Sequence, residues 1–173
     1  VLQSISEHSP VMLKITVTTA DDELAAKIEP RVSRPTERFR LIEQLSKAGL
    51  YAGILLMPVL PFIEDSLENV EEIIKKAHDA GARFIYPAFG MTLRGNQRVW
   101  YYQKLEELFP GQGLVEAYQK RFGEAYEYRS PKEAKLWAYF TEECEKRQIM
   151  YRMEDIISQY KRPYRIEQMS LPF

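Results

Sequence analysis

Polar and small residues follow each of three predicted strands, at the edge where ligands meet parallel α/β sheets. The residues at these three strand ends are Thr16, Thr18, Thr19 and Asp21, then Met57 to Pro61 with Glu64 and Asp65, then Pro87, Phe89, Gly90, Thr92 and Arg94. The hydroxyl groups of Thr16 and Thr18 are suited to lining a ligand site, although threonine is also common as a plain strand residue. Residues 90–94 offer backbone N–H groups and a guanidinium to an anion, and a solvated loop is the simpler expectation.

The chain lacks the short motifs of several enzyme classes. We find no G-x-S-x-G, G-x-x-x-x-G-K-[ST], G-x-G-x-x-G or H-E-x-x-H pattern. His8 and His78 are isolated, and we expect His78 on a helix surface. Cys144 lies between glutamates, which raise the pKa of a thiol and make it a poor nucleophile. We therefore name no catalytic residue and no metal ligand in this chain.

The first part of the chain alternates strands and helices. The spacing predicts strands over 11–18, 51–57 and 83–87 and helices over 21–29, 35–48 and 65–81. This order is typical of βαβ units in a parallel sheet. We expect Asp21 to cap a helix, Pro35 to start one and Gly49 to end one, and we expect a capping box at Asp65 and Glu68. An ion pair between Glu29 and Arg38 would hold the bend between two helices.

From residue 97 onward the chain is rich in aromatic residues and predicted to be helical. The expected helices cover 97–108, 113–122, 131–147 and 153–161, with a capping box and an N1 proline at Ser130 to Glu133. We interpret the aromatic residues as core packing. Residues 162–173 show no clear period and are expected to form an arm or to be disordered. The predicted domains are therefore 1–96, the sheet region, and 97–173, a helical extension.

The composition excludes several partner classes. The chain has 173 residues, 45% hydrophobic and 28% charged, with a formal net charge of −1. Such balance gives no electrostatic footprint for nucleic acid or an anionic membrane. The longest apolar run, 53–63, contains prolines and is too short to span a bilayer. The first residues show no signal-peptide pattern, and the single cysteine favours a reducing compartment, so we expect a cytoplasmic protein.

A string of residues over 15–61 resembles a known superfamily. Ile15-Thr-Val-Thr-Thr-Ala-Asp21, Ile28-Glu-Pro30, Arg38, Ala48-Gly49 and Met57-Pro-Val-Leu-Pro61 follow one another in the order seen in the radical S-adenosylmethionine (SAM) superfamily. More closely, the chain looks like the carboxyl-terminal half of the spore photoproduct lyase-like branch, often labelled "DNA repair photolyase". The resemblance covers residues 1–90 well, and the later segment looks like an extension of the same branch.

The resemblance implies a fold, a cofactor and binding residues. The family fold is a partial, TIM-like (βα)6 barrel, of which this chain would supply the last three strands as a half-barrel. The family cleaves SAM reductively at a [4Fe–4S] cluster held by a Cys-x3-Cys-x2-Cys loop, which this chain lacks. Thr16 matches a position that helps to hold SAM, Thr18 lies near it, and Met57, Pro58 and Val59 fall in the stretch that lines the adenine side.

These implications lead to one main expectation and several alternatives. We expect a fragment of a radical SAM enzyme of lyase type that is inactive alone, and whose partner is the missing amino-terminal half of the barrel. Nucleic acid is a partner by the family label only. The alternatives are a self-contained small α/β binding or regulatory module, a piece of a sugar-phosphate (βα)8 barrel, and a homo-oligomer that pairs its open sheet edges.

Overall fold

A parallel sheet forms the centre of the molecule. Its three strands, in the order β1-β2-β3, are β1 (Leu13–Thr16), β2 (Ala52–Leu56) and β3 (Ile85–Pro87). The structure is a computed structural model that describes residues 1–164. Each strand lies within the range that its β-branched and apolar residues predicted. The prediction of a mixed α/β fold with a parallel sheet is therefore confirmed.

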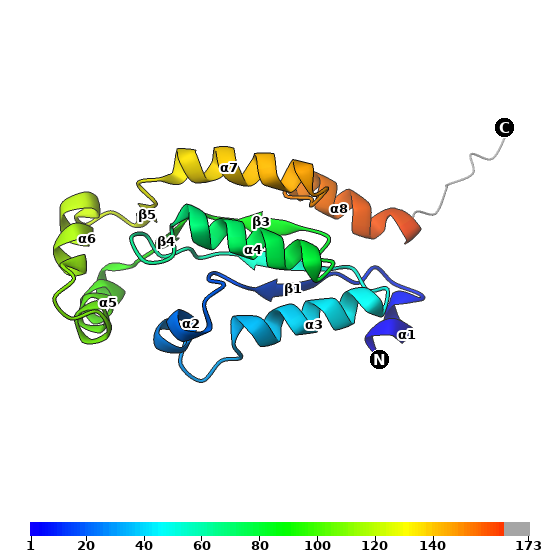
Figure 1. The fold of residues 1–173 in the computed structure, drawn as a ribbon, viewed down its shortest axis with the longest axis horizontal. Coiled ribbons are helices and arrows are strands. Elements are labelled where there is room, and N and C mark those ends of the chain that lie inside the picture. The colour runs from blue at the N-terminus through cyan, green and yellow to red at the C-terminus, as the bar shows by residue number, and fades with distance from the viewer. Residues whose placement is uncertain (165–173) are drawn as a thin grey trace, which may run out of the picture.

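Helices lie along one side of this sheet and at both of its ends (Figure 1). They are α1 (Leu2–Ser6), α2 (Asp22–Ile28), α3 (Pro35–Lys47), α4 (Leu67–Asp79), α5 (Gly95–Leu108), α6 (Leu114–Phe122), α7 (Glu133–Lys146), α8 (Met153–Lys161) and the 3-10 helix η1 (Arg162–Tyr164). Helices α3, α4 and α7 lie side by side along the strands, while α5 and α6 lie beyond one end. None of the helices in the described residues is both long and apolar enough to cross a membrane. The arm predicted over 162–173 lies, beyond Tyr164, outside the described residues.

Three of the predicted helix ends are confirmed. The Asp21 carboxylate accepts hydrogen bonds from the backbone N–H groups of Glu23 and Leu24, so it caps α2. Pro35 is the first residue of α3, where a missing N–H costs nothing. Gly49 follows α3 with a φ of +76°, a left-handed conformation that suits glycine.

Both predicted capping boxes are wrong. The cap of α4 is Ser66, whose hydroxyl accepts from Asn69 N–H, and not its neighbour Asp65. Helix α7 begins at Glu133, and the Ser130 hydroxyl instead donates to Asp65 Oδ2 at 2.5 Å. Asp65 and Ser130 are thus used for a contact between distant segments, which no local pattern reveals.

A small second sheet replaces the loop predicted at residues 90–94. Strand β4 (Gly90–Thr92) pairs antiparallel with β5 (Glu127–Arg129). Neither strand was predicted, because three residues are too few to show a period. A Cβ atom at Gly90 would lie 2.6 Å from the Tyr128 carbonyl oxygen, so the close approach of these strands requires glycine.

The main core lies on one face of the parallel sheet. Ile15, Val17, Ile54, Leu56 and Ile85 point toward α3, α4 and α7 and pack with their apolar residues. The residues that these helices contribute are Phe39, Ile42, Val70, Ile73, Ile74, Ala77, Leu136, Phe140 and Cys144. Helix α7 belongs to the segment predicted as an extension, yet it shares this core, and the boundary at residue 96 stays a prediction.

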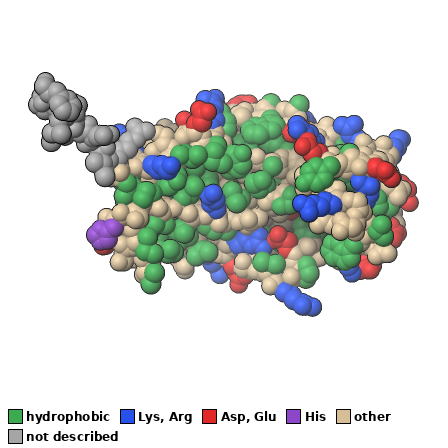
Figure 2. Space-filling model, turned by 180° about the vertical axis from the view of Figure 1, so that it is seen from behind, with side chains coloured by type: hydrophobic (Ala, Val, Ile, Leu, Met, Phe, Trp, Pro, Cys, Tyr) green, Lys and Arg blue, Asp and Glu red, His purple; other side chains and the backbone are tan. Residues whose placement is uncertain are grey.

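The opposite face of the sheet is only partly covered. Thr16, Leu55 and Tyr86 lie beside one another across the three strands on this face, and Met57 follows on the same side. All four are half-buried, and none belongs to either hydrophobic core. Figure 2 shows this side of the molecule, where hydrophobic side chains form a broad area with only a few Lys and Arg side chains.

Helix α8 covers the amino-terminal end of that same face. The Tyr51 ring stacks on Phe84 at 5.6 Å between centroids and lies 6.2 Å from the ring of Tyr160. The Tyr51 hydroxyl also contacts the Met150 sulfur and the Ile156 carbonyl oxygen. The uncovered area is therefore limited to the carboxyl-terminal half of the strands.

A second, smaller core lies at the carboxyl-terminal end of the sheet. It joins α2, α5, α6, the β4–β5 pair and the loop at residues 60–63. Tyr118 is fully buried there, and its hydroxyl donates to the Pro61 carbonyl oxygen at 2.6 Å. The Phe122 and Tyr128 rings stack at 4.5 Å. The predicted role of the later aromatic residues as core packing is confirmed for these side chains.

Arg38 fastens the carboxyl-terminal end of β1. Its guanidinium donates to the carbonyl oxygens of Thr16 and Ser33, both at 2.9 Å. It also binds Glu29 Oε2 at 2.6 Å, which confirms the predicted ion pair. The Arg38 side chain is 8% exposed, whereas the Glu29 side chain is 31% exposed, so the guanidinium is largely shielded from water and the carboxylate only in part.

Replacing Arg38 should therefore lower the free energy of unfolding substantially. We expect Arg38→Met to cost about 2 kcal/mol, because three partly buried acceptors lose a charged donor. Urea unfolding measures this value. Lys47→Met, which breaks an exposed ion pair with Glu43, is the matched control and should cost less than about 1 kcal/mol. Equal costs for the two variants would contradict the role given to Arg38.

Candidate functional site

Thr16 is the predicted binding residue with a free hydroxyl. It ends β1 on the partly covered face, and its hydroxyl makes no hydrogen bond to any residue from 1 to 164. Its carbonyl oxygen is held by Arg38, which fixes the backbone at this position. Thr16 is therefore a rigidly placed hydroxyl at the carboxyl-terminal edge of the sheet.

Thr18, by contrast, is occupied within the fold. Its hydroxyl donates to Glu64 Oε1 at 2.6 Å, and both side chains are buried. Glu64 Oε2 accepts from the Leu60 N–H at 2.9 Å. The Asn69 amide donates to the carbonyl oxygens of Thr18 and Glu64, both at 2.9 Å. Thr18 thus holds the loop after β2 against the end of β1.

Burial changes the acidity of Glu64. It raises the pKa of the carboxyl from 4.5 to about 7, against the opposing effect of the hydrogen bonds from Thr18 and Leu60. The negative charges of Glu29 and Asp65 act in the same direction as burial. Glu64 is therefore a group whose protonation changes near neutral pH inside the fold.

Asp65 forms the second buried carboxylate of this loop. Its oxygens accept from the Phe62 N–H at 2.8 Å and from the Ser130 hydroxyl. Lys132 Nζ lies 3.6 Å from Asp65 Oδ1. The hydrogen bond between Ser130 and Asp65 joins the loop after β2 to the segment just before α7, across 65 positions of sequence. Every polar side-chain atom that is buried within residues 1–164 has a hydrogen-bond partner.

Met57, Pro58 and Val59 separate in the structure. Met57 and Pro58, joined by a cis peptide bond, line a cavity of about 720 Å³. Val59 is fully buried in the main core instead. Of the five predicted binding residues, Thr16 lies free on the sheet, two line the cavity, and Thr18 and Val59 are inside the fold.

The cavity lies between the carboxyl-terminal ends of β2 and β3 and the later part of the chain. Its other lining residues are Pro87, Ala88, Phe89, Gly90, Met91, Thr92, Glu127, Arg129, Glu133 and Trp137. The sequence pointed to several of the residues from 87 to 92 but missed those on β5 and α7. Only the pairing of β4 with β5 and the packing of α7 on α4 bring them here, and no local pattern reports either contact.

The described residues offer no site for an iron–sulfur cluster. No three His, Cys, Asp or Glu side chains within residues 1–164 gather closely enough to hold a metal ion. Cys144 is buried in the main core, and burial raises the pKa of its thiol to about 12. Its location and its protonated thiol both make it unsuitable as a cluster ligand.

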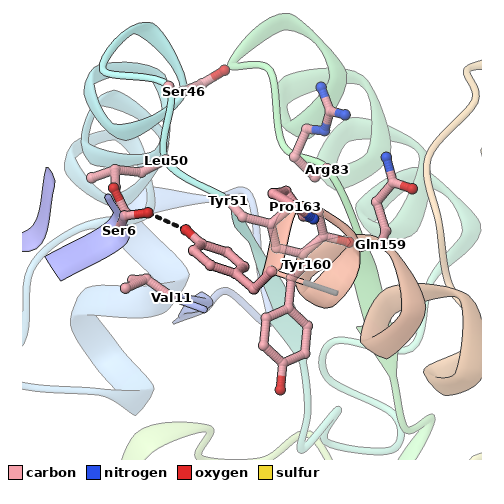
Figure 3. Close-up of a pocket in the computed structure, with 11 residues that line it drawn as sticks. Ser6, Val11, Ser46, Leu50, Tyr51, Arg83, Gln159, Tyr160 and Pro163 are labelled. Atoms are coloured by element: carbon pink, nitrogen blue, oxygen red, sulfur yellow. Dashed lines mark hydrogen bonds between the residues drawn. The ribbon is translucent and has the colours of Figure 1, made fainter. Parts of the chain in front are cut away.

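Another cavity lies at the opposite end of the strands (Figure 3). It measures about 330 Å³ and is lined by residues that precede the strands, such as Val11, Tyr51 and Arg83. Tyr160 and Pro163 close it from the α8 side. The Tyr164 hydroxyl donates to the Ser6 carbonyl oxygen and joins the two ends of the described chain here. We regard this end as structural, because ligands of parallel α/β folds bind at the carboxyl-terminal ends of strands.

Comparison with known proteins finds relatives without a described activity. The chain is 30% identical over 117 residues to "Uncharacterized protein Mb2609c" of Mycobacterium bovis and to "Uncharacterized protein Rv2578c" of Mycobacterium tuberculosis. The matched region covers 68% of this chain and 34% of each relative. It is 29% identical over 89 residues to "Uncharacterized protein ORF301" of Acidianus two-tailed virus, or 49% of this chain and 30% of the relative. No family model and no solved structure matches.

The chain spans about a third of the length of the curated relatives that it matches. Outside the matched region, each of these relatives thus contains additional sequence that is roughly twice as long as that region. Their printed names assign no substrate or cofactor.

The raised pKa of Glu64 predicts a pH dependence of stability. The folded state holds the proton up to about pH 7 and the unfolded state only up to 4.5. The stabilisation is therefore fully present below pH 4.5 and is lost as the pH rises through 7, a decrease of about 3 kcal/mol.

This decrease is measured by comparing the native protein with Glu64→Gln, which does not titrate. The native protein should lose free energy of unfolding relative to the variant between about pH 4.5 and about pH 7. Glu72→Gln, on the exposed side of α4, is the control and should not alter the pH profile. A constant difference between native protein and Glu64→Gln over this range would show that folding does not raise the pKa of Glu64.

Proposed function

We propose that this chain is the carboxyl-terminal half of a partial (βα)6 barrel of the radical SAM type, within a longer protein. The observation that carries the proposal is the partly covered sheet face, where Thr16, Leu55, Tyr86 and Met57 are half-buried and belong to neither core of residues 1–164. Parallel sheets normally have both faces covered. Three further strands would convert this face into the interior of a barrel.

The edge of β1 away from β2, where Arg38 binds the Thr16 carbonyl oxygen, supports the same proposal. In a parallel sheet alternate residues bond to opposite neighbours. Leu13 N–H and Val17 N–H donate toward β2, so the N–H groups of Lys14 and Thr16 point away from it. No strand from residues 1–164 lies on that side. The additional length of the relatives is sufficient to supply such strands.

The residues at the carboxyl-terminal edge are suited to holding SAM. In the proposed site the free Thr16 hydroxyl donates a hydrogen bond to SAM, and the apolar surface of Met57 and Pro58 contacts the adenine ring. Thr18 and Val59 support the site from inside the fold, since Thr18 orients the loop through Glu64 and Val59 anchors it in the core.

The iron–sulfur cluster belongs to another part of the proposed enzyme. When bound, the cluster supplies the electron for reductive cleavage of SAM. Its ligands cannot come from residues 1–164 and are assigned to the preceding half of the barrel. The chain alone is thus proposed to be inactive, with a cytoplasmic parent of lyase type. The family label of DNA repair would imply DNA binding, but the formal net charge of −1 gives no support to it.

A self-contained α/β binding module is the second candidate. It is favoured by the closed main core and by the complete pairing of buried polar side chains within residues 1–164. This candidate requires the β1 edge and the open sheet face to stay in contact with water in the whole protein. The two candidates therefore differ in what covers β1.

Replacing Thr16 tests its proposed contact with SAM. We expect Thr16→Val in the longer protein to weaken SAM binding by up to about tenfold, because one hydrogen bond is lost and the shape is kept. Isothermal titration calorimetry measures the affinity without turnover.

Thr36→Val, on the exposed first turn of α3, is the matched control for that experiment and should leave the affinity unchanged. Thermal unfolding should be the same for native and variant proteins. An unaltered SAM affinity of Thr16→Val would remove Thr16 from the site.

A further inference from the structure

Most of the wall of the 720 Å³ cavity is formed by residues other than the predicted cofactor-binding residues. Only Met57 and Pro58, on one of its walls, belong to the stretch assigned to SAM. The opposite wall consists of Thr92, Glu127, Arg129, Glu133 and Trp137, which come from the later segment of the chain. The cavity thus has room for a second molecule between the cofactor wall and the β4–β5 and α7 wall.

The interior of the cavity is apolar and partly aromatic. Phe89 and Trp137 form an edge-to-face pair with ring centroids 5.6 Å apart. Phe140 fixes the Trp137 ring from the core side at 5.8 Å. Phe89, Phe140 and Met91 are themselves buried in the two cores, so they support the wall from behind. The half-buried Trp137 and Met57 side chains form its accessible apolar surface.

Trp137 also supplies an available hydrogen-bond donor. Its indole N–H makes no hydrogen bond to any residue from 1 to 164, and the side chain is half-buried. Because every polar side-chain atom that is buried within residues 1–164 has a hydrogen-bond partner, this unpaired N–H is accessible to water. A ligand that carries an acceptor can replace that water.

The charged lining residues carry a net negative charge. Arg129 Nη2 lies 3.1 Å from Glu127 Oε2, and Arg129 Nη1 lies 4.0 Å from Glu133 Oε2. Two carboxylates therefore face one guanidinium. This excess of one negative charge attracts a cation and repels an anion, and it repels a polyanion most strongly. Binding of nucleic acid would need an excess of cationic groups at this position.

We propose that this cavity is the substrate subsite, and that it takes a small molecule with an aromatic or apolar body and one basic group. The body packs against the half-buried Trp137 and Met57 side chains, while the ammonium group lies near Glu133 and over the indole face. The name "substrate" rests on the proposed function, whereas the chemistry of the ligand follows from the cavity itself.

Two probes with the same ring system test the charge requirement. Tryptamine carries an ammonium group, and indole-3-propionate carries a carboxylate. We expect tryptamine to bind the protein that contains this chain and indole-3-propionate to bind at least about fivefold more weakly. Ligand-observed NMR titration measures both affinities.

Variants assign the binding to this cavity. Glu133→Gln should weaken tryptamine binding about two- to fivefold. Trp137→Leu should weaken it about fivefold through the loss of the cation–π contact. Glu106→Gln, on the exposed surface of α5 away from the cavity, is the matched control and should bind as the native protein does. Thermal unfolding of each variant confirms that it is folded.

Several outcomes would overturn the inference. Equal or tighter binding of indole-3-propionate, absence of an effect of both variants, or tighter binding of a short DNA duplex than of tryptamine would each exclude the proposed ligand class. SAM is titrated in the same samples. SAM binding without tryptamine binding would exclude the subsite and leave the proposed function standing, whereas tryptamine binding without SAM binding would support the cavity and exclude the proposed function.

Discussion

A parallel sheet has two apolar faces, and the helices within residues 1–164 cover only one of them completely. Ile54 and Ile85 are buried and Ile15 is half-buried against α3, α4 and α7, which makes that face a conventional α/β core. On the other face α8 covers Tyr51 and Phe84, and the carboxyl-terminal half stays open. The location of the candidate site follows from this asymmetry, because Thr16 and Met57 lie where the open face meets the strand ends.

Polar contacts at the strand ends hold the parts of the molecule in register. Arg38 binds the end of β1, Glu64 binds Thr18, and Asp65 binds Ser130. The Thr18–Glu64 and Asp65–Ser130 contacts are buried, so each is stronger than an exposed pair would be, and each would be costly to break. Together the three contacts join the loop after β2 to β1 and α7.

The sequence predicted the regular elements well because their signals are local. The apolar runs predicted the three strands of the parallel sheet, and Asp21 and Pro35 marked helix starts. Glu29 pairs with Arg38 as expected. Ser130 and Asp65 misled the capping predictions because each satisfies the other across the fold. Trp137 and Arg129 escaped notice as site residues because only tertiary packing brings them beside Met57. Whether Thr16 and Met57 hold SAM stays a prediction.

The central claim is that β1 is an interior strand of a larger sheet. Amide hydrogen exchange of the longer protein, resolved by residue, tests it most directly at Lys14 and Thr16, whose N–H groups point away from β2. A paired strand predicts slow exchange at these amides, comparable to that of Leu13 and Ile15. Fast exchange at Lys14 and Thr16 with slow exchange at Leu13 and Ile15 would show an open edge, and would contradict the half-barrel.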